Sequence, residues 1–229
     1  MQRIVAIIPA RGGSRAIRGK NLVDFCGKPL LAWSVEQARA SRRIAATYVS
    51  SDSAEILATA TRYGALPIER PAHLAGDAEP SESAWCHALD VIEAQDGAVD
   101  LVAGLQPTSP VREGTDLDAA IALLESRGYD SLLSCTTLAD YFIWADGADG
   151  PVSVNYDYCD RKPRQQIERR YLENGSFYLF KPQILRACNN RLGGRVGLFP
   201  MPKYKSFQID DVDDLPFLAA IMRGYGLDR

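Results

Sequence analysis

Residues 4–14 read IVAIIPARGGS, and this stretch decides the fold. Residues 4–8 are apolar without alternation, which is typical of a strand buried on both faces at the centre of a parallel sheet. The strand ends at Pro9, and the loop that follows lies at the carboxyl edge, where open α/β sheets bind ligands. We therefore expect an α/β fold with a doubly wound, mainly parallel sheet and a binding loop after its first strand.

The loop after this strand is rich in glycine and in positive charge. A Gly-Gly pair at residues 12–13 lets backbone N–H groups approach phosphate oxygens closely. Arg11, Arg15, Arg18 and Lys20 supply charge for a polyanion. The pattern is neither a G-x-x-x-x-G-K-[ST] phosphate loop nor a G-x-G-x-x-G fingerprint. A nucleoside triphosphate is the expected ligand, and a solvated basic turn is the alternative that the loop alone leaves open.

The composition is that of an ordinary globular protein. The chain has 229 residues, of which 46% are hydrophobic and 24% charged, so we expect one domain. A net charge of -3 argues against binding to nucleic acid or to a membrane surface. Five cysteines without a C-x-x-C pair suit reduced thiols, and the first apolar run is too short for a signal peptide or a membrane span. These features predict a cytoplasmic protein.

Strands and helices alternate along most of the remaining chain. Further strands are expected at residues 46–50, 65–68, 100–105, 131–134 and 176–180. Helices are expected from Pro29, at residues 54–63, from a Ser81 or Ser83 cap through Ile92, at 116–126, from Pro182 towards Cys188, and at the end through Met222. This alternation predicts βαβ units.

Two segments depart from this alternation. Residues 139–170 are aromatic but irregular, which predicts an inserted hairpin or arm that forms a homodimer contact; a lid folded on its own chain is the alternative. Residues 207–214 read FQIDDVDD, which predicts a strand followed by a helix. Its four aspartates are expected to cap the helix or face solvent, and one is a candidate magnesium ligand.

Seven motifs follow one another over essentially the whole chain. They are Pro9-Ala10-Arg11-Gly12-Gly13-Ser14, Lys20-Asn21, Arg70-Pro71, Gln106-Pro107-Thr108-Ser109-Pro110-Val111-Arg112, Pro163-Arg164-Gln165, Asn174-Gly175-Ser176-Phe177-Tyr178 and Ile209-Asp210. Together they resemble the acylneuraminate cytidylyltransferase family, the enzymes that make CMP-sialic acids. The resemblance implies one Rossmann-like nucleotidyltransferase domain over residues 1–229, with the inserted arm at about 139–170.

The resemblance also implies a reaction and a set of residues. CTP and a nine-carbon α-keto sugar acid would yield a CMP-sugar and pyrophosphate, with magnesium as the cofactor. The implied catalytic residues are Arg11, Lys20 and Asp210, and Asp210 is also the implied metal ligand. The implied nucleotide-binding residues are Ala10, Gly12, Gly13, Ser14, Asn21, Arg70, Ser81 and Ser83. The implied sugar-binding residues are Gln106, Thr108, Arg164, Asn174 and Tyr178, with Arg164 reaching the neighbouring subunit's site.

The chain departs from the family pattern at two places. Gln208 stands where family members often carry the first aspartate of Asp-Ile-Asp, and Leu192-Gly193 stands where sialate-specific relatives carry two phenylalanines. N-acetylneuraminate, legionaminate and pseudaminate therefore remain open as the sugar. The alternatives are a cytidylyltransferase for 3-deoxy-manno-octulosonate and a nucleotide-binding protein without turnover.

Overall fold

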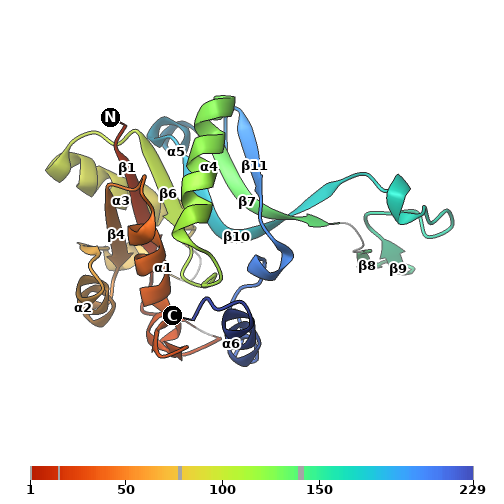
Figure 1. The fold of residues 1–229 in the computed structure, drawn as a ribbon, viewed down its shortest axis with the longest axis horizontal. Helices are drawn as coiled ribbons and strands as arrows, with labels where there is room; N and C mark the ends of the chain where they lie inside the picture. Colours follow the sequence, from red (N-terminus) through yellow and green to blue (C-terminus); the bar gives the residue numbers. More distant parts are fainter. Residues whose placement is uncertain (1, 15, 77–78, 139–141, 229) are drawn as a thin grey trace.

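The computed structural model describes residues 2–14, 16–76, 79–138 and 142–228. Within them, seven strands form one sheet in the order β11-β7-β10-β6-β1-β4-β5 (Figure 1). These strands are β1 (Ile4–Pro9), β4 (Ala46–Ser51), β5 (Leu66–Glu69), β6 (Leu101–Leu105), β7 (Ser131–Leu138), β10 (Arg170–Phe180) and β11 (Val196–Pro200). Only β10 runs antiparallel to its neighbours β6 and β7, so among the described strands the sheet is mainly parallel, as predicted.

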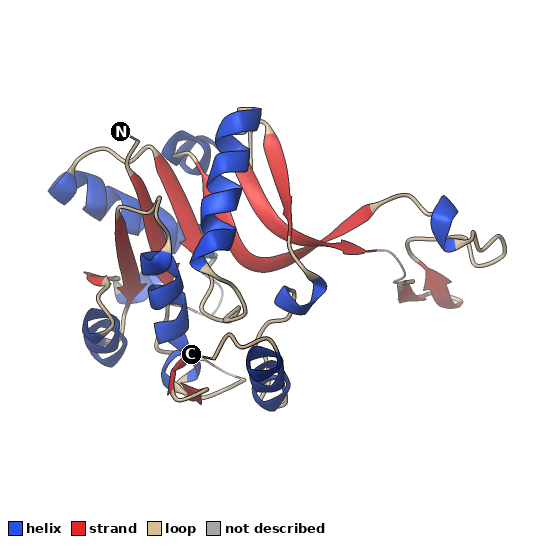
Figure 2. Cartoon of the chain, viewed as in Figure 1, coloured by secondary structure: helices blue, strands red, loops and turns tan. Residues whose placement is uncertain are grey.

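Helices cover both faces of this sheet (Figure 2). They are α1 (Leu30–Ala40), α2 (Ala54–Arg62), α3 (Ser81–Asp96), α4 (Gly114–Arg127), α5 (Pro182–Cys188) and α6 (Asp214–Gly224). Ile4, Ala6 and Ile8 of β1 pack in one cluster with α1, α2 and α4, whereas Val5 and Ile7 pack on the other face with α3 and α5. All five side chains are at most 1% exposed, and burying a large apolar side chain contributes about 1.5 to 3 kcal/mol. The doubly wound fold is therefore organised around β1.

Most predicted elements are confirmed with small changes at their ends. Ser53 caps α2 by accepting from the N–H of Ile56 at 3.5 Å. The cap expected for α3 is wrong, because Pro80 is the N-cap and Ser81 is already the first helical residue. Helix α4 begins at Gly114, two residues before the predicted start. Asp116 therefore lies inside the first turn, where its side chain accepts from the N–H of Glu113 at 2.8 Å. No helix in the described ranges is long and apolar enough to cross a membrane.

The strand expected before Asp210 is wrong. Residues 206–210 have no regular secondary structure, although the N–H of Ile209 donates to the carbonyl of Thr108 at 2.7 Å. Ile209 is fully buried in a third apolar cluster that includes Phe25 and residues of α6. Phe25 belongs to a short hairpin of β2 (Asp24–Phe25) and β3 (Lys28–Pro29). Neither this hairpin nor strand β11 was predicted from the sequence. A single apolar residue between polar neighbours is thus anchored without joining a sheet.

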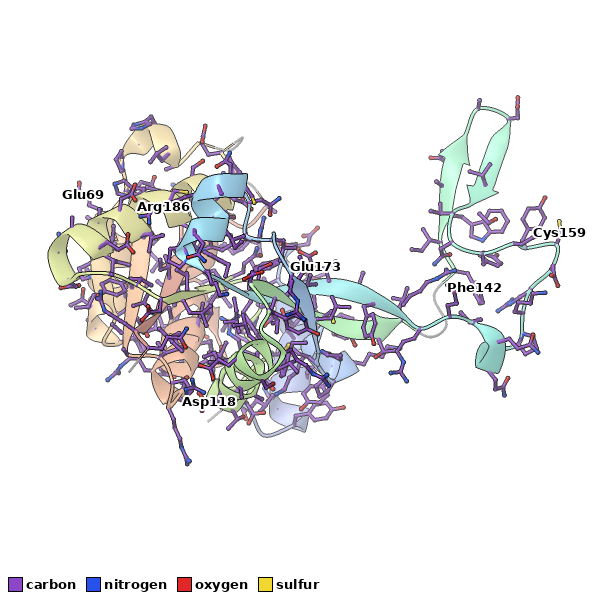
Figure 3. The ribbon with its side chains drawn as sticks, turned by 90° about the horizontal axis from the view of Figure 1, so that it is seen from above. Glu69, Asp118, Phe142, Cys159, Glu173 and Arg186 are labelled. Atoms are coloured by element: carbon purple, nitrogen blue, oxygen red, sulfur yellow. The ribbon has the colours of Figure 1, made fainter. Side chains whose placement is uncertain are left out.

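The predicted arm is present and projects from the body. It carries an antiparallel hairpin of β8 (Trp144–Gly147) and β9 (Gly150–Ser153), and the ends of β7 and β10 form its stalk. Figure 3 shows Phe142 and Cys159 on the arm, far from Glu69 on the body. The first residues of the predicted arm, 139–141, lie outside the described residues. The arm is therefore continuous with two strands of the main sheet.

Candidate active site

A cavity of about 320 Å³ opens at the carboxyl edge of the sheet. Its walls come from the segment after β1, the end of β6, the segment after β5 and the start of α3, which the parallel strands bring to the same edge. Eight of the predicted site residues line it: Arg11, Ser14, Lys20, Asn21, Arg70, Ser81, Gln106 and Thr108. The fold thus gathers residues from four separate parts of the sequence.

Two arginines give one side of this cavity its positive charge. Arg11 donates through Nη1 to the carbonyl of Gly76 at 3.2 Å. Arg70 is only 6% exposed and donates to the carbonyl of Ser50 at 2.8 Å, while its buried Nε has no hydrogen-bond partner among the described residues. Burial lowers the pKa of Arg70, Asp52 opposes this shift, and Arg11 adds to it. An anion bound between the two arginines would relieve their mutual repulsion.

A third cation, Lys20, connects the first loop to the end of the chain. Its Nζ donates to the carbonyl oxygen of Ile209 at 2.9 Å and lies 3.3 Å from the carboxylate of Asp210. The Lys20 side chain is 12% exposed, whereas that of Asp210 is 72% exposed. The carboxylate therefore remains open to solvent and to a ligand.

The backbone of the first loop is held by its neighbours. The N–H of Ala10 donates to the carbonyl of Ser50 at 2.9 Å, and the side chain of Asn21 donates to the carbonyl of Arg11 at 2.9 Å. The N–H of Gly12 donates to Asp52 at 2.8 Å, and a Cβ added at Gly12 would lie 3.1 Å from Cβ of Ser53. Gly12 thus packs against the β4–α2 turn, with its N–H engaged.

Gly13 and Ser83 do not line the cavity in the structure. A Cβ added at Gly13 would meet nothing within 4 Å, so no close approach by a described atom requires a glycine there. Ser83 donates to the carboxylate of Glu79 at 3.3 Å on the first turn of α3. Of the two predicted serines, the structure places Ser81 on the cavity wall.

Two further predicted sugar-binding residues, Asn174 and Tyr178, are buried in strand β10. Asn174 is 2% exposed and accepts from the hydroxyl of Ser134 at 2.6 Å. The hydroxyl of Tyr178 donates to Glu173. The pKa of Tyr178 is raised, mainly by burial and to a smaller extent by this hydrogen bond. Gln106 reaches the cavity from the end of β6. The side chain of Arg164 lies outside the described part of the structure, and so does Arg15.

Arg112 supports the cavity from behind, and its role was not assigned from the sequence. It is 2% exposed and donates to the carbonyl of Ser176 at 2.6 Å, to the carbonyl of Gln106 at 3.3 Å and to the hydroxyl of Ser34. Burial lowers the pKa of this guanidinium. Arg112 therefore ties β6 to β10 where Gln106 enters the cavity. The signal in the sequence that could have indicated this role is the position of Arg112 directly after a buried strand and a loop with two prolines.

The carboxylates of this edge are dispersed. Among the described residues, no group of three or more His, Cys, Asp or Glu side chains is arranged to hold a metal ion. Asp210 offers one exposed carboxylate beside the cationic wall, and magnesium commonly uses one or two carboxylates together with substrate phosphates. The donor set therefore suits a magnesium ion that is shared with a bound phosphate chain.

Comparison with known proteins points to one family. The family model described as cytidylyltransferase matches residues 5–147. The chain is 30% identical over 239 residues to N-acylneuraminate cytidylyltransferase of Oncorhynchus mykiss, covering 100% of this chain but 53% of that protein. It therefore spans about half the length of that relative. It is also 30% identical over 217 residues to pseudaminic acid cytidylyltransferase of Campylobacter jejuni (strain 81-176), covering 93% of each.

A solved structure shows the same fold. CMP:2-keto-3-deoxy-manno-octonic acid synthetase complexed with CTP matches with a TM-score of 0.72, covering 98% of this chain and 100% of that chain. The two sequences are 15% identical, so this likeness concerns the fold alone. It agrees with the predicted Rossmann-like sheet of a nucleotidyltransferase.

Proposed function

Because the chain belongs to the acylneuraminate cytidylyltransferase family, we propose that it joins CTP to a nonulosonic acid, giving a CMP-sugar and pyrophosphate. The observation that carries the proposal is the cavity wall formed by Arg11, Lys20 and Arg70 at the carboxyl edge of the sheet. Three cations that converge beside polar side chains suit a triphosphate. Among the relatives reported above, two are named for a nine-carbon acid and one for an eight-carbon acid.

In the proposed reaction, the anomeric hydroxyl of the sugar acid attacks the α-phosphorus of CTP. The new bond joins that oxygen to phosphorus, the bond to the β-phosphate oxygen breaks, pyrophosphate leaves, and the hydroxyl proton passes to solvent. Catalysis then depends on positioning and on neutralising charge. Arg11 and Lys20 would hold the phosphates, and Arg70, which also lines the cavity, would contact the nucleotide.

Further nucleotide contacts belong to the same proposal. In the first loop, Ser14 lines the cavity and would contact the nucleotide, while Ala10, Gly12 and Gly13 would shape the loop, because the N–H groups of Ala10 and Gly12 are already bonded within the protein. The start of α3 would contribute Ser81 and Ser83. Asn21 fixes the carbonyl of Arg11, so it would orient the loop as well as face the nucleoside.

The sugar acid would bind next to the triphosphate. Gln106 and Thr108 line the cavity there, and Asn174 and Tyr178 lie behind them on β10, the strand next to β6. Arg164 would pair with the carboxylate of the sugar acid, because guanidinium and carboxylate groups match in a bidentate geometry. The arm that carries Arg164 would deliver it to the neighbouring subunit of a homodimer.

Magnesium would be held by Asp210 and the phosphates of CTP. When bound there, the ion supplies charge neutralisation for the phosphate groups. The protein's own contribution is the exposed carboxylate of Asp210, which Lys20 orients at 3.3 Å. Cytoplasmic location is likewise a proposal, supported by five cysteines that are all free thiols in the structure.

One assay tests the function. Pyrophosphate release should be measured with each of the four nucleoside triphosphates against N-acetylneuraminate, legionaminate, pseudaminate and 3-deoxy-manno-octulosonate. We expect turnover with CTP and a nine-carbon acid. Turnover only with the eight-carbon acid would favour the octulosonate enzyme. CTP binding without turnover on any acid would favour a nucleotide-binding protein.

A further inference from the structure

Gln208 connects the cavity wall at Thr108 to strand β10 of the sheet. Its Nε2 donates to the backbone carbonyl of Asn174 on β10 at 2.8 Å, and its Oε1 accepts from the hydroxyl of Thr108 at 3.4 Å. Thr108 lines the cavity, while Asn174 is buried in the sheet. Since a carbonyl oxygen requires a donor opposite it, the amide cannot be flipped without losing the shorter bond. Both polar atoms of the side chain are therefore engaged.

The backbone of β10 is shaped to receive this amide. Gly175 has a φ of 63°, in the left-handed region that favours glycine. A Cβ added at Gly175 would lie 2.4 Å from Nε2 of Gln208, closer than any real contact. The pairing register of β10 with β7 also shifts between Glu173 and Tyr178, which frees this part of the strand from the ladder. Gly175 and Gln208 thus pack as a matched pair.

The residues after Gln208 carry this connection to the charged side chains. The N–H of Ile209 donates to the carbonyl of Thr108 at 2.7 Å, and the carbonyl of Ile209 accepts from Lys20 at 2.9 Å. Asp210 follows directly. Residues 206–210 belong to no strand, so these contacts, together with the hydrogen bond from the N–H of Asp210 to the carboxylate of Asp214 at 2.8 Å, hold Lys20 and Asp210 in place.

The same segment is anchored at its other end by a buried lysine. Lys205 is 3% exposed, and its Nζ lies 2.8 Å from Glu113 and 2.7 Å from Asp116 at the start of α4. The segment is thus held at Lys205, at Gln208 and at Ile209. Of these three, only Gln208 reaches across to β10 with its side chain.

We propose that Gln208 is a positioning residue that fixes Lys20 and Asp210 through Thr108, and that it does not bind the metal. A neutral side chain is required there, because a carboxylate would face the carbonyl oxygen of Asn174. The part of the proposal that concerns turnover rests on the proposed function. The brace, meaning the hydrogen bonds of Gln208 to Asn174 and Thr108, does not depend on that function. If Gln208 were instead a metal ligand, a negative charge at this position would make metal binding tighter.

The experiment compares Gln208→Glu with Gln2→Glu, the same chemical change at an exposed position. Thermal unfolding is measured in EDTA, and Mn²⁺ binding to the CTP complex is measured by electron paramagnetic resonance. We expect Gln208→Glu to lower Tm by about 4 °C or more, the scale of losing a part-buried hydrogen bond and setting a carboxylate against a carbonyl oxygen in a chain of this size, and Gln2→Glu to leave Tm unchanged. Mn²⁺ binding should be no tighter in Gln208→Glu.

Where Gln208→Glu does not fold, Gln208→Met removes the hydrogen bonds without adding charge and is measured in the same way. With CTP and the sugar acid, we expect Gln208→Met to reduce kcat by about 10²-fold, the scale of a small misplacement of catalytic groups, with a smaller change in KM for CTP. Wild-type Tm in EDTA for both variants, or tighter Mn²⁺ binding by Gln208→Glu, would overturn the proposal. If the wild-type protein makes no CMP-sugar, the proposed function fails, but unfolding in EDTA still tests the brace.

Discussion

The ammonium group of Lys20 lies 3.3 Å from the carboxylate of Asp210, although 190 positions separate the two residues. The pair joins the loop after the first strand to the segment before the last helix. Lys20 is largely enclosed and Asp210 is open, so a bound phosphate chain can contact the cation while the carboxylate stays available to a metal ion. The first two predictions concern this arrangement.

Asp210→Asn should lower turnover by about 10²-fold or more, because it removes the charge of the proposed magnesium ligand beside Lys20. Asp213→Asn should be nearly silent, since Asp213 is exposed and its side chain makes no capping bond to α6. Steady-state pyrophosphate release at saturating magnesium measures both. Equal losses of turnover in the two variants would show that Asp210 is not the magnesium ligand.

Arg11→Ala and Lys20→Ala should each weaken CTP binding by about 2 to 5 kcal/mol, the cost of removing one partner from an enclosed charge pair. Arg43→Ala is the matched control, because Arg43 forms an ion pair with Glu125 on the exposed surface. Titration calorimetry with CTP and magnesium gives the affinities. Normal CTP binding by Arg11→Ala would move the phosphate site away from the first loop.

Arg112→Lys should destabilise the protein by about 2 to 4 kcal/mol. Lysine cannot reach the carbonyls of Gln106 and Ser176 and the hydroxyl of Ser34 together, so buried acceptors lose their donor. Urea unfolding of this variant and of Arg43→Lys provides the comparison. An unchanged midpoint for Arg112→Lys would mean that this guanidinium does not hold β6 against β10.

Asp214 should make folding sensitive to acid. Its carboxylate accepts from the N–H groups of Asp211 and Asp210 at 2.7 and 2.8 Å, and these bonds hold its pKa below the ordinary value. The folded pKa is therefore below the unfolded value of about 3.9, so the stabilisation is present above that pH and is lost as pH falls through the folded pKa. Between pH 6 and pH 3, Tm should fall more in the wild type than in Asp214→Asn, with Asp213→Asn behaving like the wild type. Parallel curves for all three proteins would contradict this.

The arm should hold two subunits together. Trp144 is 46% exposed and Tyr158 is 60% exposed, and their rings lie 5.3 Å apart on the surface of the arm. Light scattering at micromolar concentration should give about twice the chain mass of 25.1 kDa for the wild type. The double variant Trp144→Ser/Tyr158→Ser should give the mass of one chain. A wild-type mass of 25.1 kDa would exclude the dimer.

The sequence predicts the parts of this fold that repeat a regular pattern. Residues 4–8 are buried on both faces as expected, because continuous apolar runs of this length require two covered faces. The order of strands and helices followed from the same reasoning. Gln106 and Thr108 were assigned to the site from the family resemblance, and both line the cavity because they follow β6 at the carboxyl edge of the sheet.

Other parts depend on distant partners and could not be predicted. Ile209 looked like part of a strand, but its N–H is bonded to Thr108, which is remote in the sequence. Asn174 was expected to face the sugar. In the structure its side-chain oxygen accepts from the hydroxyl of Ser134 and from the N–H of Ser176 inside the sheet. Asp52 accepts from the N–H of Gly12 at 2.8 Å, a contact between residues 40 positions apart. Side-chain partners of this kind leave no periodic signal in the sequence.

The stalk of the arm is a two-stranded ladder in which Leu138 pairs with Arg170 and Cys135 pairs with Glu173. Successive residues of a strand face opposite sides, so removing one residue from each strand would turn the arm over, whereas removing two would shorten it and keep its orientation. Changes in arm length that keep the same face of the hairpin turned outward therefore come in steps of two residue pairs.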